Sequence, residues 1–328
     1  MTLKDRYILY IRNVRRYSAR TVDIYEGVLC DFIRHAHDGE DVSDAELLAS
    51  LNHSEIRSYE AARLEEGLSA RTVCLHLSAL SSFCRYLIKE GHLKSNPVKL
   101  VAKPKKSKRL PEFFREEAMN DYFERTSYVL EPAELDFFIQ NHATKSGKEM
   151  YEDRLRRLII SMLYSLGLRR AELIGLSIAD VDFGRNVVKV HGKGNKMREI
   201  PLIVSLCQEI LLYLKAVEAM CGGKRSLKEP LLVTYRGEGL YPAYVDRAVK
   251  KGLKDYGDMT GRKSPHVLRH SLATGLMNED VSINSIKELL GHSSLSATQV
   301  YTHGSIAKLK SNYEQAHPRA KNGGKHGD

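Results

Sequence analysis

Two stretches in the first third of the chain place apolar residues three and four positions apart, which is the pattern of an amphipathic helix packed on a core. Each stretch follows a serine, Ser18 or Ser69, whose side chain can accept a hydrogen bond from an unpaired backbone N–H at a helix start. The apolar positions are Val22, Tyr25, Leu29, Phe32 and Ile33, and then Val73, Leu77, Leu80, Phe83 and Leu87. This region is therefore expected to form a small all-helical domain.

The two helix starts, Ser18–Val22 and Ser69–Val73, have the same five residue types in the same order. Because there are only two copies, this repeated motif indicates the same capping chemistry at two helix starts rather than a solenoid repeat. Arg20 and Arg71 lie in the first turns, where helix N-termini and guanidinium groups both favour anions. They are candidates for contacts to DNA phosphates, and a coincidental pair of surface arginines is the alternative.

The pattern changes in the later part of the chain. A nearly continuous apolar helix is predicted over Leu155–Leu166 and ends at Gly167, and another helix is predicted to begin within Glu172–Ile178. Alternation indicates strands at Asn186–His191 and Met197–Ile203, and the glycines and asparagine between them favour a hairpin.

From Leu206 onward the pattern is mainly helical, with one short apolar strand candidate at Leu231–Thr234. The predicted fold class is mainly α with a small antiparallel β-sheet (α+β). We expect a helical domain over residues 1–98, a linker over 99–111 and a mixed domain over 112–328.

The expected linker is strongly basic. It contains prolines, which disfavour a helix, and no acidic residue, so its like charges repel one another unless a polyanion lies nearby. A solvated linker without a partner is one interpretation, and contact with the DNA backbone is the other. Its cationic residues are Lys99, Lys103, Lys105, Lys106, Lys108 and Arg109.

Composition supports a globular protein with an affinity for polyanions. The 328 residues are 42% hydrophobic and 28% charged, which excludes a disordered or collagen-like chain. The 51 Lys+Arg against 41 Asp+Glu give a net charge of +10 and a pI of about 9.2, typical of nucleic-acid binders but not specific to them.

Nothing in the sequence indicates secretion or membrane insertion. No apolar stretch approaches the roughly 20 residues of a bilayer span, and the first residues lack the hydrophobic block of a signal peptide. The five cysteines form no Cys-x-x-Cys pair, so we expect reduced thiols rather than disulfides or a zinc site. A soluble, intracellular protein is expected.

Two short segments of the second domain combine cationic residues with helix ends. Glu172 lies three residues after Arg169, so its carboxylate can orient that guanidinium at the corner after Gly167, although such pairs are common on surfaces. Further on, Ser264 and Pro265 predict a helix start that places His266 and Arg269 on one face near the N-terminus, where the dipole favours an anion.

Two different interpretations compete at this second segment. His266 and His270 are four residues apart, as in a zinc-protease helix, but the glutamate that would act as the base there is missing. A buried histidine on a capped helix is the structural alternative. Beyond it, Leu289–His292 predicts a helix that ends at Gly291, and Tyr301 follows His292 by 9 residues.

In chain order, these residues resemble the full active-site set of the tyrosine recombinase (phage integrase) family. The set comprises Arg169, Lys193 in a Gly-Lys-Gly tip, His266-x-x-Arg269, Leu-Gly-His292 and Tyr301. The resemblance covers nearly the whole chain and is closest to the Xer recombinases, in which the first domain is a helical core-binding (SAM-like) domain and the second is catalytic.

The resemblance implies that Tyr301 attacks a DNA phosphodiester and forms a 3′-phosphotyrosyl ester, leaving a free 5′ hydroxyl. Arg169 and Arg269 would each donate two parallel hydrogen bonds to the non-bridging oxygens, which the point charge of a lysine cannot do. The resemblance also implies that His266 acts as a base or proton relay and that Lys193 protonates the 5′ oxygen. His292 would donate a hydrogen bond to a non-bridging oxygen, and the Glu172 carboxylate would orient Arg169.

Because the ester stores the bond energy, the resemblance implies no nucleotide or metal cofactor. The implied partners are a double-stranded DNA target site and a homo- or hetero-tetramer acting on two such sites, in the cytoplasm and associated with the nucleoid. An apolar stripe at Ile306, Leu309 and Tyr313 fits a helix donated to a neighbouring protomer or packed within its own chain. We expect a flexible tail over Lys321–Asp328.

Xer-like resolution of chromosome dimers, with a role in chromosome partition and cell division, is the expected task. The integrase or invertase of a mobile element has the same chemistry. The sequence also leaves open a DNA-binding regulatory protein with a vestigial catalytic set, and a type IB topoisomerase. The chain departs from the Xer pattern at Ala171 and in the long stretch Asn120–Glu152.

Overall fold

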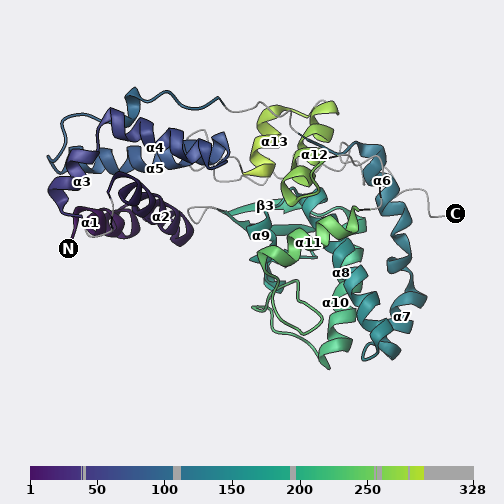
Figure 1. Ribbon diagram of the computed structural model, residues 1–328. Helices are drawn as coiled ribbons and strands as arrows, with labels where there is room; N and C mark the ends of the chain where they lie inside the picture. Colours follow the sequence, from purple (N-terminus) through teal and green to yellow (C-terminus); the bar gives the residue numbers. More distant parts are fainter. Residues whose placement is uncertain are drawn as a thin grey trace. The chain divides into compact units, whose positions relative to one another are not determined.

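The computed structural model describes residues 1–37, 39, 42–105, 112–192, 197–254, 256, 261–279 and 281–291. The chain divides into two compact units, Met1–Arg109 and Leu110–Asp328 (Figure 1). Among the described residues, no helix has both the length and the apolar character needed to cross a membrane.

The first unit is helical, and its longest helices begin at the predicted serines. Ser18 Oγ accepts a hydrogen bond from the Thr21 backbone N–H at 3.3 Å, and Ser69 Oγ accepts one from Thr72 at 3.2 Å. Its elements are α1 (Leu3–Leu9), the π-helical turn η1 (Tyr10–Val14), α2 (Ala19–Ala36), α3 (Asp44–Ser50), α4 (His53–Glu65), α5 (Ala70–Lys89) and the 3₁₀ turn η2 (Pro97–Leu100).

The apolar faces of α2 and α5 pack together in the core of this unit, where Phe32 and Phe83 are fully buried. Val98 and Val101 of the η2 region join the same core. Residues 102–105 then continue without helix or strand. The predicted amphipathic pattern is therefore confirmed for both helices.

The second unit combines helices with one small sheet. Its helices are α6 (Glu116–Arg125), η3 (Ser127–Leu130), α7 (Pro132–Asn141), α8 (Lys145–Leu166), α9 (Arg170–Ile174), η4 (Ile178–Asp180), α10 (Val204–Cys221), α11 (Pro242–Gly252), α12 (Pro265–Asn278) and α13 (Ile283–Leu290). Its strands are β1 (Val181–Asp182), β2 (Val187–His191) and β3 (Met197–Pro201), in the order β1-β2-β3 and antiparallel throughout. The predicted fold class is confirmed.

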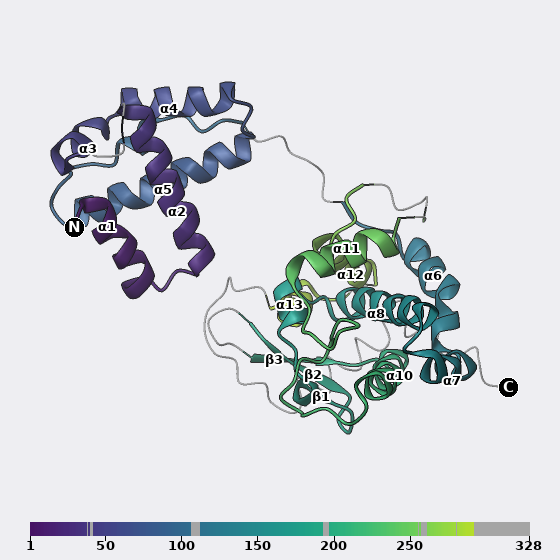
Figure 2. The same cartoon turned by 60° about the horizontal axis from the view of Figure 1, so that its bottom comes forward.

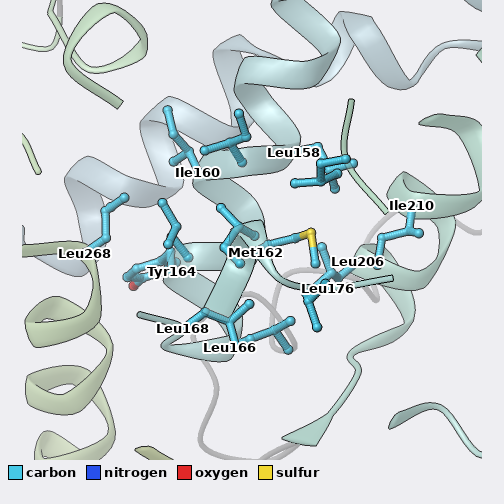
Figure 3. Packing of buried hydrophobic residues seen from close by; sticks show 14 of the residues in the cluster. Leu158, Ile160, Met162, Tyr164, Leu166, Leu168, Leu176, Leu206, Ile210 and Leu268 are labelled. Carbon is cyan, nitrogen blue, oxygen red and sulfur yellow. The ribbon is translucent and has the colours of Figure 1, made fainter. Parts of the chain in front are cut away.

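Helix α8 forms the centre of this unit and contacts α7, α9, α10, α11 and α12 (Figure 2). From Leu155 to Leu166 nearly every side chain is buried and most are apolar, as expected of a helix in the core. Figure 3 shows Leu158 and Met162 of α8 near Leu206 and Ile210 of α10. The long stretch 120–152 supplies the end of α6, η3, α7 and the first turns of α8.

The hairpin prediction is confirmed, and its register determines which side chains face the core. Val188 pairs with Ile200 and Val190 pairs with Arg198. All four of these residues are buried, whereas Lys189 and Glu199, which pair with each other, lie on the more exposed face. A buried arginine therefore occupies a position that would suit an apolar residue.

Two of the predicted elements were wrong in detail. The helix expected to begin at Glu172–Ile178 is α9, which begins earlier, at Arg170, and ends at Ile174 because the chain turns at Gly175 and forms η4. Leu231–Thr234 forms no strand: the backbone makes only the isolated bridges Ser177–Pro230 and Val233–Gly239. Its apolar residues are buried because they pack on the core rather than in a sheet.

Candidate functional site

Arg169 is positioned by the corner at the end of α8. Gly167 terminates α8 in the left-handed conformation, with φ of 58°, and Arg169 directly precedes α9. Glu172 in the first turn of α9 accepts hydrogen bonds from the Arg169 backbone N–H at 2.8 Å and from Arg169 Nη1 at 2.7 Å. The carboxylate therefore orients the guanidinium, as expected from the spacing.

Arg269 comes from α12 and lies beside this corner. Its side chain is buried, and it donates hydrogen bonds to the carbonyls of Gly167 and Leu290, both at 2.5 Å. Burial, followed by repulsion from the Arg169 charge, lowers its pKa from 12.5 to about 10, so it stays charged at neutral pH. The structure thus brings together two arginines that lie far apart in the sequence.

A third guanidinium, which sequence reasoning missed, completes the cluster. Arg198 donates two hydrogen bonds to Glu172, from Nη1 to Oε1 at 3.0 Å and from Nη2 to Oε2 at 2.9 Å. The signal was available, because Arg198 shares the strand parity of the apolar residue Ile200 and a charge at a core-facing position needs a partner.

The charges in this cluster do not balance among the described residues. Burial alone would raise the pKa of Glu172, but hydrogen bonds from Arg198 and from the Arg169 backbone lower it below its ordinary value. One ionised carboxylate therefore faces three guanidinium groups, those of Arg169, Arg198 and Arg269. The excess positive charge favours binding of an anion.

A cavity of about 380 Å³ opens beside the cluster. Arg169, Arg269, His266 and Lys287 contribute polar groups to its lining, together with apolar residues of α12 and α13. His266 is exposed, so the alternative of a buried histidine is wrong. His270 also lines the cavity, but within the described ranges no three His, Cys, Asp or Glu side chains gather as a metal-binding group.

The environment of His266 favours the neutral imidazole. Partial desolvation of the ring by neighbouring atoms, then the positive charges of Arg170 and Arg269, lower its pKa below the ordinary value of 6.5. The imidazole is therefore mostly uncharged at pH 7 and is able to accept a proton.

We expect Arg170→Gln to raise the pKa of His266, because removing a nearby positive charge stabilises the imidazolium. An NMR titration of the His266 ring in the free protein would measure this shift. Arg185→Gln is the control, since Arg185 pairs with Glu199 on the exposed face of the hairpin and is not among the charges that lower the pKa of His266. A pKa that moves equally in both variants, or in neither, would contradict this electrostatic origin.

The remaining predicted residues are distributed as follows. Arg20, Arg71, Lys103 and Lys105 are exposed residues of the first unit. The candidates that lie outside the described residues are Lys106, Lys108, Arg109, Lys193, His292 and Tyr301, together with the stripe at Ile306, Leu309 and Tyr313 and the tail Lys321–Asp328.

Comparisons with known proteins identify the family. The model of the phage integrase family matches residues 129–307, and that of the phage integrase N-terminal SAM-like domain matches residues 5–91. The chain belongs to the phage integrase family of tyrosine recombinases. It is 32% identical to tyrosine recombinase XerC of Chlorobaculum parvum, over 96% of this chain and 94% of that protein.

Solved structures share the fold of this family member. The XerH site-specific recombinase bound to a palindromic difH substrate has a TM-score of 0.64 and 21% identity, covering 92% of this chain and 81% of that one. A lambda integrase tetramer bound to a Holliday junction has a TM-score of 0.56 and 20% identity, covering 91% and 80%. As a Xer-like tyrosine recombinase, the chain is an enzyme of DNA strand cleavage and rejoining.

Proposed function

We propose that the chain cuts and rejoins double-stranded DNA at a specific site through Tyr301 and resolves chromosome dimers. The observation that carries the proposal is the group of three guanidiniums around one carboxylate, two of which line a cavity beside a neutral histidine. The similarity to XerC over nearly the full chain supports the Xer-like task.

The arginines retain donors for a phosphate. Each terminal nitrogen of a guanidinium carries two hydrogens. In Arg169 and Arg269, the bonds to described residues use one hydrogen on each of these nitrogens. The remaining hydrogens allow paired hydrogen bonds to the non-bridging oxygens, where negative charge grows as the phosphorus becomes pentavalent.

The step balances without a co-reactant. The Oη–P bond to Tyr301 forms while the P–O5′ bond breaks, the phenol loses its proton, and the departing 5′ oxygen gains one. A free phenol has a pKa near 10 and is a poor nucleophile at neutral pH. By family resemblance, we assign His266 to accept the phenolic proton, Lys193 to protonate the 5′ oxygen and His292 to donate a hydrogen bond to the phosphate.

DNA is the proposed partner of both units. The exposed Arg20 and Arg71, at the starts of α2 and α5, would contact backbone phosphates together with Lys103 and Lys105. Since a lambda integrase of the same fold is a tetramer on a Holliday junction, we propose a tetramer on two DNA sites, with the Ile306–Tyr313 stripe donated between protomers. The cytoplasm is the proposed compartment.

A trapping experiment tests the cleavage step. Duplexes selected by the protein from a random-sequence pool would be nicked at successive central positions, so that cleavage near a nick releases a short strand and leaves the protein attached. We expect a covalent complex on a denaturing gel in the presence of EDTA, with the phosphate mapped to the Tyr301 peptide by mass spectrometry.

Four outcomes would refute parts of this proposal. Binding without any covalent complex would indicate a regulatory DNA-binding protein, and attachment at another residue would remove Tyr301 from its role. Relaxation of supercoiled DNA without a preferred sequence would indicate a topoisomerase. If the selected sequence occurs at the ends of a mobile element instead of once in the chromosome, dimer resolution is the wrong task.

A further inference from the structure

The end of α13 is held by three arginines on three consecutive carbonyls. Arg198 Nε donates to the Leu289 carbonyl at 3.0 Å, Arg269 Nη2 to Leu290 at 2.5 Å, and Arg169 Nη2 to Gly291 at 2.9 Å. The last carbonyls of a helix lack intrahelical partners and carry the negative end of its dipole. The three cations therefore fix the point at which the chain leaves α13 toward His292.

Arg198, like Arg169, joins Glu172 to the end of α13. Its guanidinium bonds both oxygens of Glu172, and its Nε bonds Leu289, so one planar group connects α9 to α13. The side chains of Arg198 and Glu172 are only 8% and 5% exposed, which keeps water from competing for these bonds. The described residues lining the cavity do not include Arg198.

Gly291 permits this close approach. It has φ of 64°, and a Cβ at this position would lie 3.1 Å from Arg198 Nη1 and 3.3 Å from its Cζ. The left-handed backbone favours glycine here, and a larger residue would also press its Cβ against the guanidinium of Arg198. Gly291 thus leaves room for the Arg198 guanidinium beside the helix end.

We propose that Arg198 is a positioning residue for strand cleavage, which aligns Arg169 through Glu172 and sets the start of the segment leading to His292 and Tyr301. The proposal rests on the proposed function. Arg198 would not contact the phosphate itself; its effect would reach the reaction through the direction of the Arg169 guanidinium and the place of the α13 end.

Arg198→Lys tests this role on the trapping duplexes, with protein limiting and DNA saturating. Lysine keeps the positive charge but cannot bond both Glu172 oxygens and the Leu289 carbonyl together. We expect the rate constant of covalent-complex formation to fall about 10- to 100-fold, while DNA affinity and the final fraction of trapped protein stay unchanged.

Arg185→Lys is the matched control. Arg185 also bonds both oxygens of a glutamate, Glu199, at 3.0 and 2.7 Å, and Glu199 adjoins Arg198 in β3, but this pair lies on the more exposed face of the hairpin. We expect this variant to cleave at the wild-type rate.

Each other result excludes the role. A purely structural role would lower the trapped fraction at an unchanged rate constant, and a purely electrostatic role would leave Arg198→Lys as fast as wild type.

If Arg198→Lys does not fold, Glu172→Gln replaces it, with the same expected loss of rate and an unchanged final fraction of trapped protein. If both variants fold, the rate constant of the double variant should fall by less than the product of the two single fold-losses, because both substitutions act on Arg169. A fall equal to that product would overturn the proposal.

The two proposals fail in different ways. If the wild-type protein forms no covalent complex on any duplex, the proposed function fails. If the wild type is trapped but Arg198→Lys matches it in rate, the positioning role alone fails.

Discussion

Arg269→Lys is expected to slow formation of the covalent complex by about 10²- to 10³-fold, which corresponds to ~2.7–4 kcal/mol of barrier. Arg269 holds two backbone carbonyls and retains hydrogens for the phosphate, and lysine cannot reproduce this geometry. The burial that lowers the pKa of Arg269 to about 10 would also lower that of a lysine, whose ordinary pKa is already only about 10.4. The rate constant for trapping on nicked duplexes measures the effect.

Two further variants bracket this measurement. Tyr301→Phe provides the zero level, since it lacks the attacking oxygen. Arg125→Lys provides the upper level, because the side chain of Arg125 is 65% exposed and pairs with Asp121 on α6. An Arg269→Lys protein that is trapped at the Arg125→Lys rate would show that Arg269 takes no part in stabilising the transition state.

Glu209→Ala is expected to lower the free energy of unfolding by about 3–5 kcal/mol. Glu209 on α10 is buried, accepts a hydrogen bond from Ser161 at 2.7 Å and lies 3.4 Å from Arg157 Nε of α8. Arg157 also donates to Phe123 and Thr126, which ties α6 to the central helix. Removing the carboxylate leaves a buried cation without its counter-charge.

Urea denaturation followed by far-UV circular dichroism measures this loss, since the chain has no tryptophan to report by fluorescence. Asp121→Ala is the control, because its ion pair with Arg125 is exposed and should contribute at most about 1 kcal/mol. The double variant Arg157→Met/Glu209→Leu should recover much of the stability, because it removes both charges. Equal losses for Glu209→Ala and Asp121→Ala would contradict this account.

Helix ends were predictable where a local signal exists. Ser18 and Ser69 cap α2 and α5 because their side chains accept a hydrogen bond from an unpaired backbone N–H. Gly167 and Gly291 terminate α8 and α13 because glycine adopts the left-handed conformation. Leu231–Thr234 was misassigned because a short apolar run indicates burial and not a particular backbone.

The site was predictable in its members but not in its assembly. Spacing placed Glu172 beside Arg169, but the approach of Arg269 depends on the packing of α12 against α8, which no local pattern encodes. The family resemblance supplied the grouping. The role of Arg198 does not follow from the position of β3 alone, because it depends on which strand residues face inward and on which carboxylate lies opposite them.

The hairpin register also limits how this enzyme can vary or be engineered. Because successive side chains of a strand point to opposite faces, deleting one residue within β3 would exchange Arg198 with Glu199 and bury an acid where a base belongs. Designs should therefore keep the number of residues in β3 unchanged. Alignments and designs of related enzymes should treat the parity of this strand as a constraint as strict as residue identity.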